Sequence, residues 1–366
     1  MEYHIEQGEK SLTADQIMGM CQRGFGSNVQ IESIDELSGG TFNTTYLVTF
    51  ADARKVILRV SPPQTADLAW DEALLMRREH SIQPFFAPVA ALMPKTLLVD
   101  FTHQLIDRDY IFQTFIEGER WDHVMDDLTP AENGNLWDQF GNIMKLIHNV
   151  HGETFGLPLS GFQFARWSQT VIDRLERTLQ SAKDHQLDIP HLANILELVR
   201  AHPQRLDEIQ VPCLLHGDLW SFNILIRRGE NDPAIVGILD ADRAWWGDPL
   251  ADWTMFILAH AEREEGHSRF WEAYGQPEET PSARFRASVY DAMHAGTAFI
   301  WAAGHQDEET LERAEGTLRE AMEILPALRG EQGIQHRTAA NSHSARSHSI
   351  CLFSKCGRII LSRGFK

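Results

Sequence analysis

The order of apolar and polar residues along the chain predicts short strands near the amino terminus and amphipathic helices further on. Stretches rich in β-branched and aromatic residues over 31–37 and 44–50 favour strands, as does an apolar run over 56–60 that a proline pair soon follows. A further strand is expected over 110–118. Helical spacing of apolar residues recurs in a larger set of segments: 66–79, 131–149, 167–183, 191–202, 250–261, 282–303 and 308–325.

Polar residues lie at the ends of three short apolar runs in the middle of the chain. The runs 211–215, 224–226 and 235–239 are typical of buried strands. Asp218 follows the first run, Asn223 immediately precedes the second, and Asp240 immediately follows the third. Transfer of a phosphoryl group requires a carboxylate to receive or orient a hydroxyl proton, and oxygen ligands to hold Mg²⁺ against the phosphates. The spacing therefore indicates this chemistry.

The complete series is H-G-D-x4-N over 216–223, an apolar strand that ends in Asp240, and then G-D-P over 247–249. It resembles the signature of the aminoglycoside phosphotransferase / choline kinase family, whose members are small-molecule relatives of the protein kinases. The resemblance implies a bilobal, protein-kinase-like α+β fold. Its amino-terminal lobe would hold an antiparallel sheet with one main helix, and its larger carboxy-terminal lobe would be mostly helical.

The resemblance also implies roles for single residues. Asp218 would be the catalytic base, and Asn223 and Asp240 would bind the magnesium ion. It implies domain boundaries as well: a nucleotide-binding lobe over 1–115 and a catalytic and substrate-binding lobe over 116–329. Residues 330–366, which hold six basic residues and one acidic residue, have the composition of a disordered tail.

A glycine-containing segment joins the first two predicted strands. Its residues Gly39, Gly40, Thr41 and Asn43 are candidates for binding nucleotide phosphates, because glycine lets backbone N–H groups approach an anion closely. An ordinary hairpin turn is the alternative interpretation of this segment. Its place ahead of the other motifs resembles a shortened form of the kinase glycine-rich loop.

Arg59 occupies the position where the family is expected to have a lysine. Arginine is always charged and can hold a phosphate with two N–H donors, so the function survives in principle, although the exchange is not conservative. Glu72 on the predicted helix is the expected ion-pair partner, with Asp71 and Glu79 as second choices. In the crossover after the strand at 110, Gln113 and Phe115 are candidates for contact with the nucleotide base through their backbone.

Residues near the catalytic motifs are candidates for the wall of the substrate site: Trp220, Asp242, Trp245 and Trp246. Tryptophan rings could stack on a sugar or a quaternary ammonium group. Clustered tryptophan is also ordinary core material, and that alternative stays open.

Composition limits the partners. The net charge of −19 argues against a nucleic-acid partner, which would need a basic surface, and it would attract a cationic substrate. No apolar run of the length needed to cross a membrane is present, and no signal peptide is expected at the amino terminus. Four cysteines form no disulfide framework, which favours the cytoplasm.

Three hypotheses follow. The leading one is a kinase that uses ATP, or GTP, with Mg²⁺ to phosphorylate a hydroxyl of a small molecule such as an aminoglycoside, a choline-like amino alcohol or a sugar. The second is a nucleotide-binding pseudoenzyme, in which Arg59 has weakened or abolished transfer. The third is an unrelated hydrolase that uses Asp218 and His216, which would leave the glycine segment and Arg59 unexplained.

Overall fold

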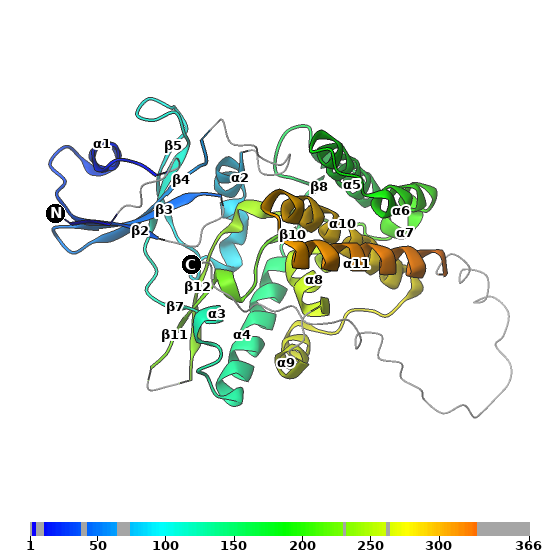
Figure 1. The fold of residues 1–366 in the computed structure, drawn as a ribbon. Helices are drawn as coiled ribbons and strands as arrows, with labels where there is room; N and C mark the ends of the chain where they lie inside the picture. Colours follow the sequence, from blue (N-terminus) through cyan, green and yellow to red (C-terminus); the bar gives the residue numbers. More distant parts are fainter. Residues whose placement is uncertain are drawn as a thin grey trace. The chain divides into compact units, whose positions relative to one another are not determined.

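The predicted amino-terminal strands form in the computed structural model, which describes residues 2–4, 11–37, 42–63, 74–229, 232–260 and 264–327 (Figure 1). Strands β2 (Ile31–Leu37) and β3 (Thr44–Phe50) have the predicted bounds. Positions along β3 alternate between buried and half-buried, because one face of the strand packs on the core. The two strands pair antiparallel, and their strand predictions are confirmed.

These strands belong to a six-stranded sheet. Its other members are β1 (Glu2–His4), β4 (Lys55–Val60), β5 (Thr96–Asp100) and β6 (Tyr110–Thr114). The order is β1-β2-β3-β4-β6-β5, with β1 parallel to β2 and all other neighbours antiparallel. Helix α1 (Ala14–Phe25) begins at a capping box on Thr13 and buries Ile17, Met20 and Cys21 in one apolar cluster with the sheet.

Helix α2 (Leu75–Ile82) precedes the 3₁₀ helix η1 (Gln83–Val89). The first part of the helix predicted over 66–79 lies outside the described residues, and α2 extends three residues beyond the predicted end. Buried positions on α2 include a carboxylate, Glu79, beside Leu75, Met76 and Ile82. This arrangement brings a charge to the apolar face of the helix.

A three-stranded sheet carries the motifs from the middle of the chain. It consists of β7 (Glu119–Arg120), β11 (Ile224–Arg227) and β12 (Ala234–Ile238), in the order β12-β11-β7. Short helices flank these strands: α3 (Trp121–Val124), η2 (Ser221–Asn223) and η3 (Ala241–Arg243).

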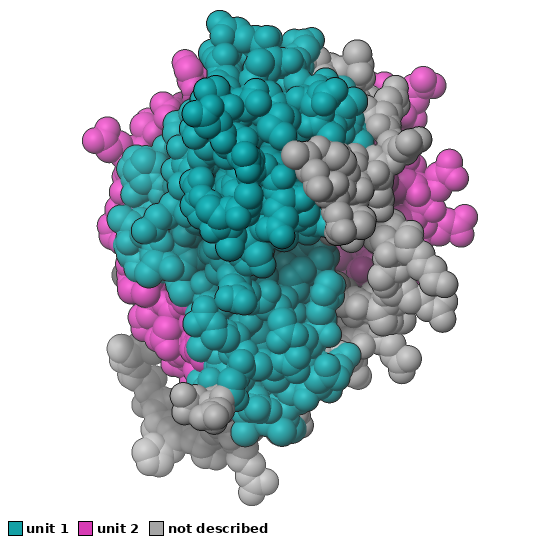
Figure 2. All heavy atoms as spheres, turned by 90° about the vertical axis from the view of Figure 1, so that its left-hand side faces the viewer, with its two compact units in different colours: residues 1–136, 221–243, 362–366 teal, residues 137–220, 244–361 magenta. Residues whose placement is uncertain are grey.

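The described residues form two compact units, coloured separately in Figure 2. Unit 1 holds those within 1–136 and 221–243, and unit 2 holds those within 137–220 and 244–327. The hairpin of β11 and β12 thus belongs to unit 1 by its contacts, whereas the expected boundary at 115 assigned it to the carboxy-terminal lobe. The predicted tail over 330–366 lies outside the described residues.

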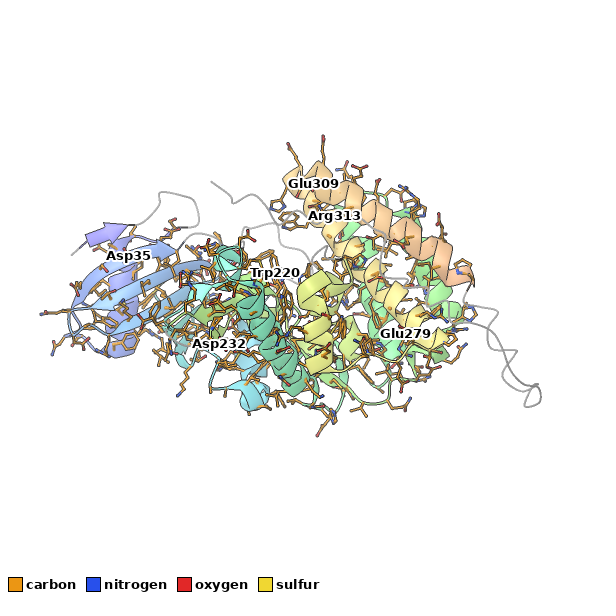
Figure 3. The ribbon with its side chains drawn as sticks, turned by 90° about the horizontal axis from the view of Figure 1, so that it is seen from below. Asp35, Trp220, Asp232, Glu279, Glu309 and Arg313 are labelled. Carbon is orange, nitrogen blue, oxygen red and sulfur yellow. The ribbon has the colours of Figure 1, made fainter. Side chains whose placement is uncertain are left out.

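Unit 2 is mostly helical. Its small sheet has the order β10-β13-β8-β9, formed by β8 (Phe155–Gly156), β9 (Gln163–Phe164), β10 (Cys213–Leu215) and β13 (Trp245–Gly247). Its helices are the greater part of α4 (Pro130–His148), α5 (Trp167–Asp184), α6 (Pro190–Ala201), α7 (Pro203–Leu206), η4 (Pro249–Ala251), α8 (Trp253–His260), α9 (Glu264–Tyr274), α10 (Pro281–His305) and α11 (Glu308–Ala327). Glu309 and Arg313, labelled in Figure 3, form an ion pair of 2.9 Å one turn apart on α11.

Six of the predicted helices match α4, α5, α6, α8, α10 and α11 to within a few residues, whereas α1 and α9 were not predicted. The described part of the chain contains no helix that is both long and apolar enough to span a bilayer.

Candidate active site

Arg59 on β4 lies inside a group of carboxylates in unit 1. Its side chain is 10% exposed, and one terminal nitrogen, Nη1, donates to Glu79 at 2.6 Å. The other terminal nitrogen, Nη2, donates to Asp240 at 2.5 Å and to Asp242 at 3.4 Å. Buried charges are stable only when they are paired and hydrogen-bonded, so this guanidinium and these carboxylates depend on one another.

Glu79 is the residue that pairs with Arg59, and the expected partner Glu72 lies outside the described residues. Glu79 had been a second choice. The Nε2 atom of Gln113 donates to its other oxygen at 3.1 Å, so both carboxylate oxygens have donors. Glu79 shares the buried face of α2 with apolar residues, and this helical spacing was a signal in the sequence that favoured it over an exposed glutamate.

Asp240 and Asp242 differ in exposure and in the direction of their pKa shifts. The side chain of Asp240 is 40% exposed and that of Asp242 is 6% exposed. Burial and the neighbouring Asp240 raise the pKa of Asp242 well above its usual range. Burial alone would also raise the pKa of Asp240, but Arg59, a hydrogen bond with Asp242 and the charge of Arg243 outweigh it and lower the pKa. Asp240 is therefore the ionised and accessible carboxylate of the pair.

The backbone of Asp240 has a φ of 62°, in the left-handed region that few residues other than glycine adopt. Asparagine and aspartate tolerate this conformation better than most residues, and such strain concentrates at functional sites. The conformation turns the chain immediately after β12.

Asn223 is brought close to Asp240 by the β11–β12 hairpin. Ile224 pairs with Ile238, and the carbonyl of Asn223 accepts a hydrogen bond from the N–H of Leu239 at 2.9 Å. Asn223 is 6% exposed. An amide oxygen and a carboxylate are ligand types that Mg²⁺ accepts.

Carboxylate oxygens of Glu79, Asp240 and Asp242 lie within 4.8 Å of one another, which is close enough for oxygens that share one cation. Arg59 is the cation that these three carboxylates share, and among them Asp240, with its lowered pKa and 40% exposed side chain, fits a magnesium ligand beside Asn223.

The segment predicted to bind phosphates is described only at its end. Gly39, Gly40 and Thr41 lie outside the described residues. The Nδ2 atom of Asn43 donates to Asp242 at 3.4 Å, and the guanidinium carbon of Arg243 lies 4.9 Å from the centre of the Phe42 ring. Two neighbouring residues after the glycines thus contact two neighbouring residues after Asp240.

The two crossover candidates have different surroundings. Gln113 is 3% exposed and lies in β6 between β4 and β5, so its side chain positions Glu79. Phe115, just beyond the strand, is half-buried, and the ammonium of Lys55 lies 5.4 Å from its ring centre. The expected contact of Gln113 and Phe115 with a nucleotide base through their backbone stays a prediction.

In unit 2, Asp218 is half-buried on the loop after β10, and a buried carboxylate fixes this loop. Asp252, which is fully buried, accepts hydrogen bonds from the backbone N–H groups of His216 at 2.8 Å and Gly217 at 3.0 Å. The Nε2 atom of His148 donates to it at 3.1 Å. Burial would raise the pKa of Asp252, but these partners lower it below its usual range.

Side-chain hydrogen bonds also fix the residue after Asp218 and the G-D-P motif. The hydroxyl of Thr254 in α8 donates to the carbonyl of Leu219 at 2.5 Å. Asp252, just before α8, and Thr254 thus fix the chain on the two sides of Asp218. Asp248 accepts from the hydroxyl of Tyr290 at 2.7 Å and from Arg286 at 3.1 Å. The motif is thus a structural anchor of unit 2.

A comparison with protein-family models decides the identity. The model described as the phosphotransferase enzyme family matches residues 33–287, which include every motif above. The chain belongs to this phosphotransferase family. The comparison with curated protein sequences finds no match.

Solved structures share the fold of this phosphotransferase family member. A candidate aminoglycoside phosphotransferase from Ralstonia eutropha JMP134 aligns with a TM-score of 0.60 at 13% identity, covering 86% of this chain and 98% of its own. A thermostable mutant of the aminoglycoside phosphotransferase APH(4)-Ia gives 0.60 at 17% identity, covering 86% and 99%. At these identities the likeness shows the fold alone. The predicted protein-kinase-like α+β fold is thereby confirmed.

Most of the residues proposed for the substrate wall of this phosphotransferase family member are buried in the core or in the carboxylate group around Arg59. Trp245 and Trp246 are 2% and 5% exposed, and Trp245 packs on Trp167 at 5.4 Å between ring centres. They are core residues, since large apolar rings gain most from full burial. Asp242 is buried against Arg59, so it belongs to the carboxylate group. Trp220, labelled in Figure 3, is half-buried, and its role stays a prediction.

The hydrolase hypothesis loses its support. His216 is fully buried, and its backbone serves as a donor to Asp252. A general base must reach a proton on the substrate, which a side chain excluded from the surface cannot do.

Proposed function

We propose that the protein transfers the γ-phosphate of ATP, or of GTP, to a hydroxyl group of a small molecule. The observation that carries the proposal is the ion-paired arrangement of Arg59 with Glu79 and Asp240. A kinase requires a cation on this strand that is braced by a glutamate from the following helix. Membership of the phosphotransferase family supports the same reaction class.

In the proposed reaction, Asp218 accepts or orients the proton of the substrate hydroxyl. The hydroxyl oxygen attacks the γ-phosphorus, and the bond between that phosphorus and the bridging oxygen breaks, so that the nucleoside diphosphate leaves with the electron pair. The backbone N–H groups of His216 and Gly217 donate hydrogen bonds to Asp252, and these bonds fix the position of the Asp218 carboxylate. A fixed base contributes about 10²–10⁴-fold to such a step.

Asn223 and Asp240 would hold the magnesium ion, which when bound neutralises charge on the phosphates. Asp240 suits this role because it is ionised and 40% exposed. Gly39, Gly40, Thr41 and Asn43 would cradle the phosphates.

Arg59 would contact the α- and β-phosphates, while Gln113 and Phe115 border the nucleotide base. The role first expected for Glu72, as the ion-pair partner of Arg59, is instead proposed for Glu79, which Arg59 contacts directly.

The acceptor would be a small and preferably cationic molecule. Structural neighbours have been solved with gentamicin, and with AMP-PNP together with hygromycin B. The net charge of −19 would favour a cationic acceptor by attraction and disfavour nucleic acid. The protein would act in the cytoplasm, where ATP and GTP are present.

A nucleotide-binding pseudoenzyme is the second candidate, because Arg59 replaces the expected lysine. Arg59 nevertheless pairs with Glu79 as a lysine would, and a second hydrogen bond reaches Asp240. Asp218, Asn223 and Asp240 are all present. These residues together support an active kinase over a pseudoenzyme.

The first experiment is a thermal-shift titration of the purified protein with ATP and GTP, with and without Mg²⁺. A ligand that binds only the folded state raises the melting temperature, and we expect a rise that depends on Mg²⁺. A coupled assay of nucleoside diphosphate release over aminoglycosides, choline, sugars and amino alcohols then identifies the acceptor.

Asp218→Asn separates the two candidates. We expect nucleotide binding to persist while transfer falls by at least about 10²-fold. Asp184→Asn, an exposed aspartate of unit 2, serves as the control and should leave transfer unchanged. If the wild type binds nucleotide but transfers phosphate to no acceptor, the result would favour the pseudoenzyme. If the wild type binds no nucleotide at millimolar concentration, the result would contradict both candidates.

A further inference from the structure

Arg243 is a second cation beside the carboxylates of unit 1. It is half-buried at the end of η3, three residues after Asp240. Its guanidinium carbon lies 4.9 Å from the centre of the Phe42 ring. Phe42 directly follows the glycine segment that is proposed to bind phosphates. The charge therefore lies where Phe42, the first described residue after this segment, contacts the turn that carries Asp240.

Arg243 lies one residue after Asp242 and three residues after Asp240, at the end of η3. Asp242 accepts hydrogen bonds from Arg59 and from Asn43, each at 3.4 Å. Two guanidinium groups thus lie beside the same turn. A nucleoside triphosphate placed against Asp240 through a metal ion would lie within reach of the same positive charge.

Arg59 is already committed to structural contacts. Both of its terminal nitrogens donate to carboxylates, and its side chain is only 10% exposed. A turn of Arg59 toward a phosphate would weaken its pairing with the buried Glu79, so Arg59 alone has few donors to spare. Phosphates that carry several negative charges require further donors.

The contact with Phe42 suits Arg243 to this task. A guanidinium on an aromatic ring uses its flat face, whereas its N–H donors lie along its edge. The ring thus orients the group without consuming a donor. Arginine is also the side chain best able to hold a phosphate with two parallel hydrogen bonds.

We propose that Arg243 binds the phosphate groups of the nucleotide and that Phe42 positions it for this contact. The inference rests on the proposed function, because it requires that a nucleotide binds in unit 1. It adds a phosphate-binding cation on the turn after Asp240 to the phosphate contact proposed for Arg59, which also holds the carboxylates.

The test compares the affinity of the full chain for adenosine, ADP and ATP, with Mg²⁺ present, by isothermal titration calorimetry. If the wild type prefers GTP, guanosine, GDP and GTP are used. For Arg243→Gln we expect the affinity for the triphosphate to fall at least about tenfold, or 1.4 kcal/mol. Affinity for the nucleoside, which has no phosphate, should change by less than about twofold.

Arg54→Gln is the matched control. Its guanidinium carbon lies 5.0 Å from the ring centre of Phe50, so the substitution removes the same charge and the same kind of ring contact from unit 1. Its affinities should equal those of the wild type. Arg243→Lys keeps the charge and should fall between the wild type and Arg243→Gln, whereas Phe42→Leu keeps the arginine and should weaken the triphosphate alone. These two variants carry the test if Arg243→Gln does not fold.

Two results would overturn the inference. Triphosphate affinity of the Arg243 variants equal to that of Arg54→Gln would show that no phosphate contact exists. An equal loss for nucleoside and triphosphate would show that Arg243 only shapes the site. If the wild type binds no nucleotide at all, the proposed function itself fails, which is a different outcome from normal binding by both the wild type and Arg243→Gln.

Discussion

Arg59 donates a hydrogen bond of 2.5 Å to Asp240, a residue 181 positions further along the chain. The same guanidinium reaches Glu79 at 2.6 Å, so one side chain links β4, α2 and the turn after β12. A lysine would offer a single ammonium, whereas the two terminal nitrogens of arginine hold both carboxylates at once. Arginine at this position therefore makes two contacts within unit 1 that a lysine could not make in the same way.

Removal of this cation should destabilise the protein. For Arg59→Gln we expect the free energy of unfolding to fall by about 3–5 kcal/mol, because buried carboxylates lose their charge partner. Urea denaturation measures the change. As a control, Arg228→Gln breaks an exposed pair with Glu119 and should cost less than about 1 kcal/mol. Similar losses in the two variants would show that the Arg59 contacts add no stability.

Asp252→Asn should damage the loop that carries Asp218. The amide nitrogen of asparagine would face a backbone N–H group or His148, each of which donates to the carboxylate in the native protein. We expect a loss of about 1–3 kcal/mol in stability for each donor left without an acceptor. Transfer should fall much more than nucleotide affinity, since the residues proposed to bind the nucleotide belong to unit 1. Equal decreases in turnover and nucleotide affinity would refute a role specific to the loop.

Gly247→Ala tests the packing of the G-D-P motif. A Cβ atom at this position would lie 2.6 Å from the ring of Trp167 and 2.9 Å from Leu215, both of which are fully buried. Overpacking of this kind costs about 1–3 kcal/mol. Gly316→Ala on α11 is the control, because no atom lies within 4 Å of its added Cβ. It should instead stabilise the helix by up to about 1 kcal/mol, and the opposite order of melting temperatures would contradict the packing argument.

The sequence was sufficient to predict those features that depend on local pattern. The β-branched and aromatic residues of β2 and β3, the apolar runs of β11 and β12, and the spacing of most helices are each visible in a short stretch of sequence. Such patterns depend on only a few neighbouring residues, so one sequence is enough to detect them. The H-G-D-x4-N series was equally visible, because it is contiguous.

Pairings across long separations could not be predicted. The pairing of Arg59 with Glu79 depends on how α2 packs against β4. The separation of 104 residues between His148 and Asp252 hides their contact in the sequence. Trp245 shows the same limit, because a tryptophan beside a catalytic motif has the same sequence signature whether it lines a site or packs on Trp167. Only tertiary packing separates these alternatives.

The stability of the protein should depend on pH through His294. Burial lowers the pKa of His294 to about 4, and its Nε2 atom donates to the carbonyl of Ala251 at 3.0 Å. The unfolded chain takes up this proton below about pH 6.5, while the folded chain does so only near pH 4. Protons therefore favour unfolding between these values, and the contribution to stability, fully present above pH 6.5, is lost as the pH falls.

Between pH 7 and pH 5 we expect the wild type to lose about 2 kcal/mol more than His294→Gln, which keeps a donor for Ala251. Burial also raises the pKa of Asp291 to about 6, an effect of the opposite sign that is common to both proteins and cancels in the comparison. Urea denaturation at the two pH values measures the difference, with His305→Gln, an exposed histidine on the same helix, as the control. Parallel pH dependence of the wild type and His294→Gln would mean that His294 is not kept neutral by the fold.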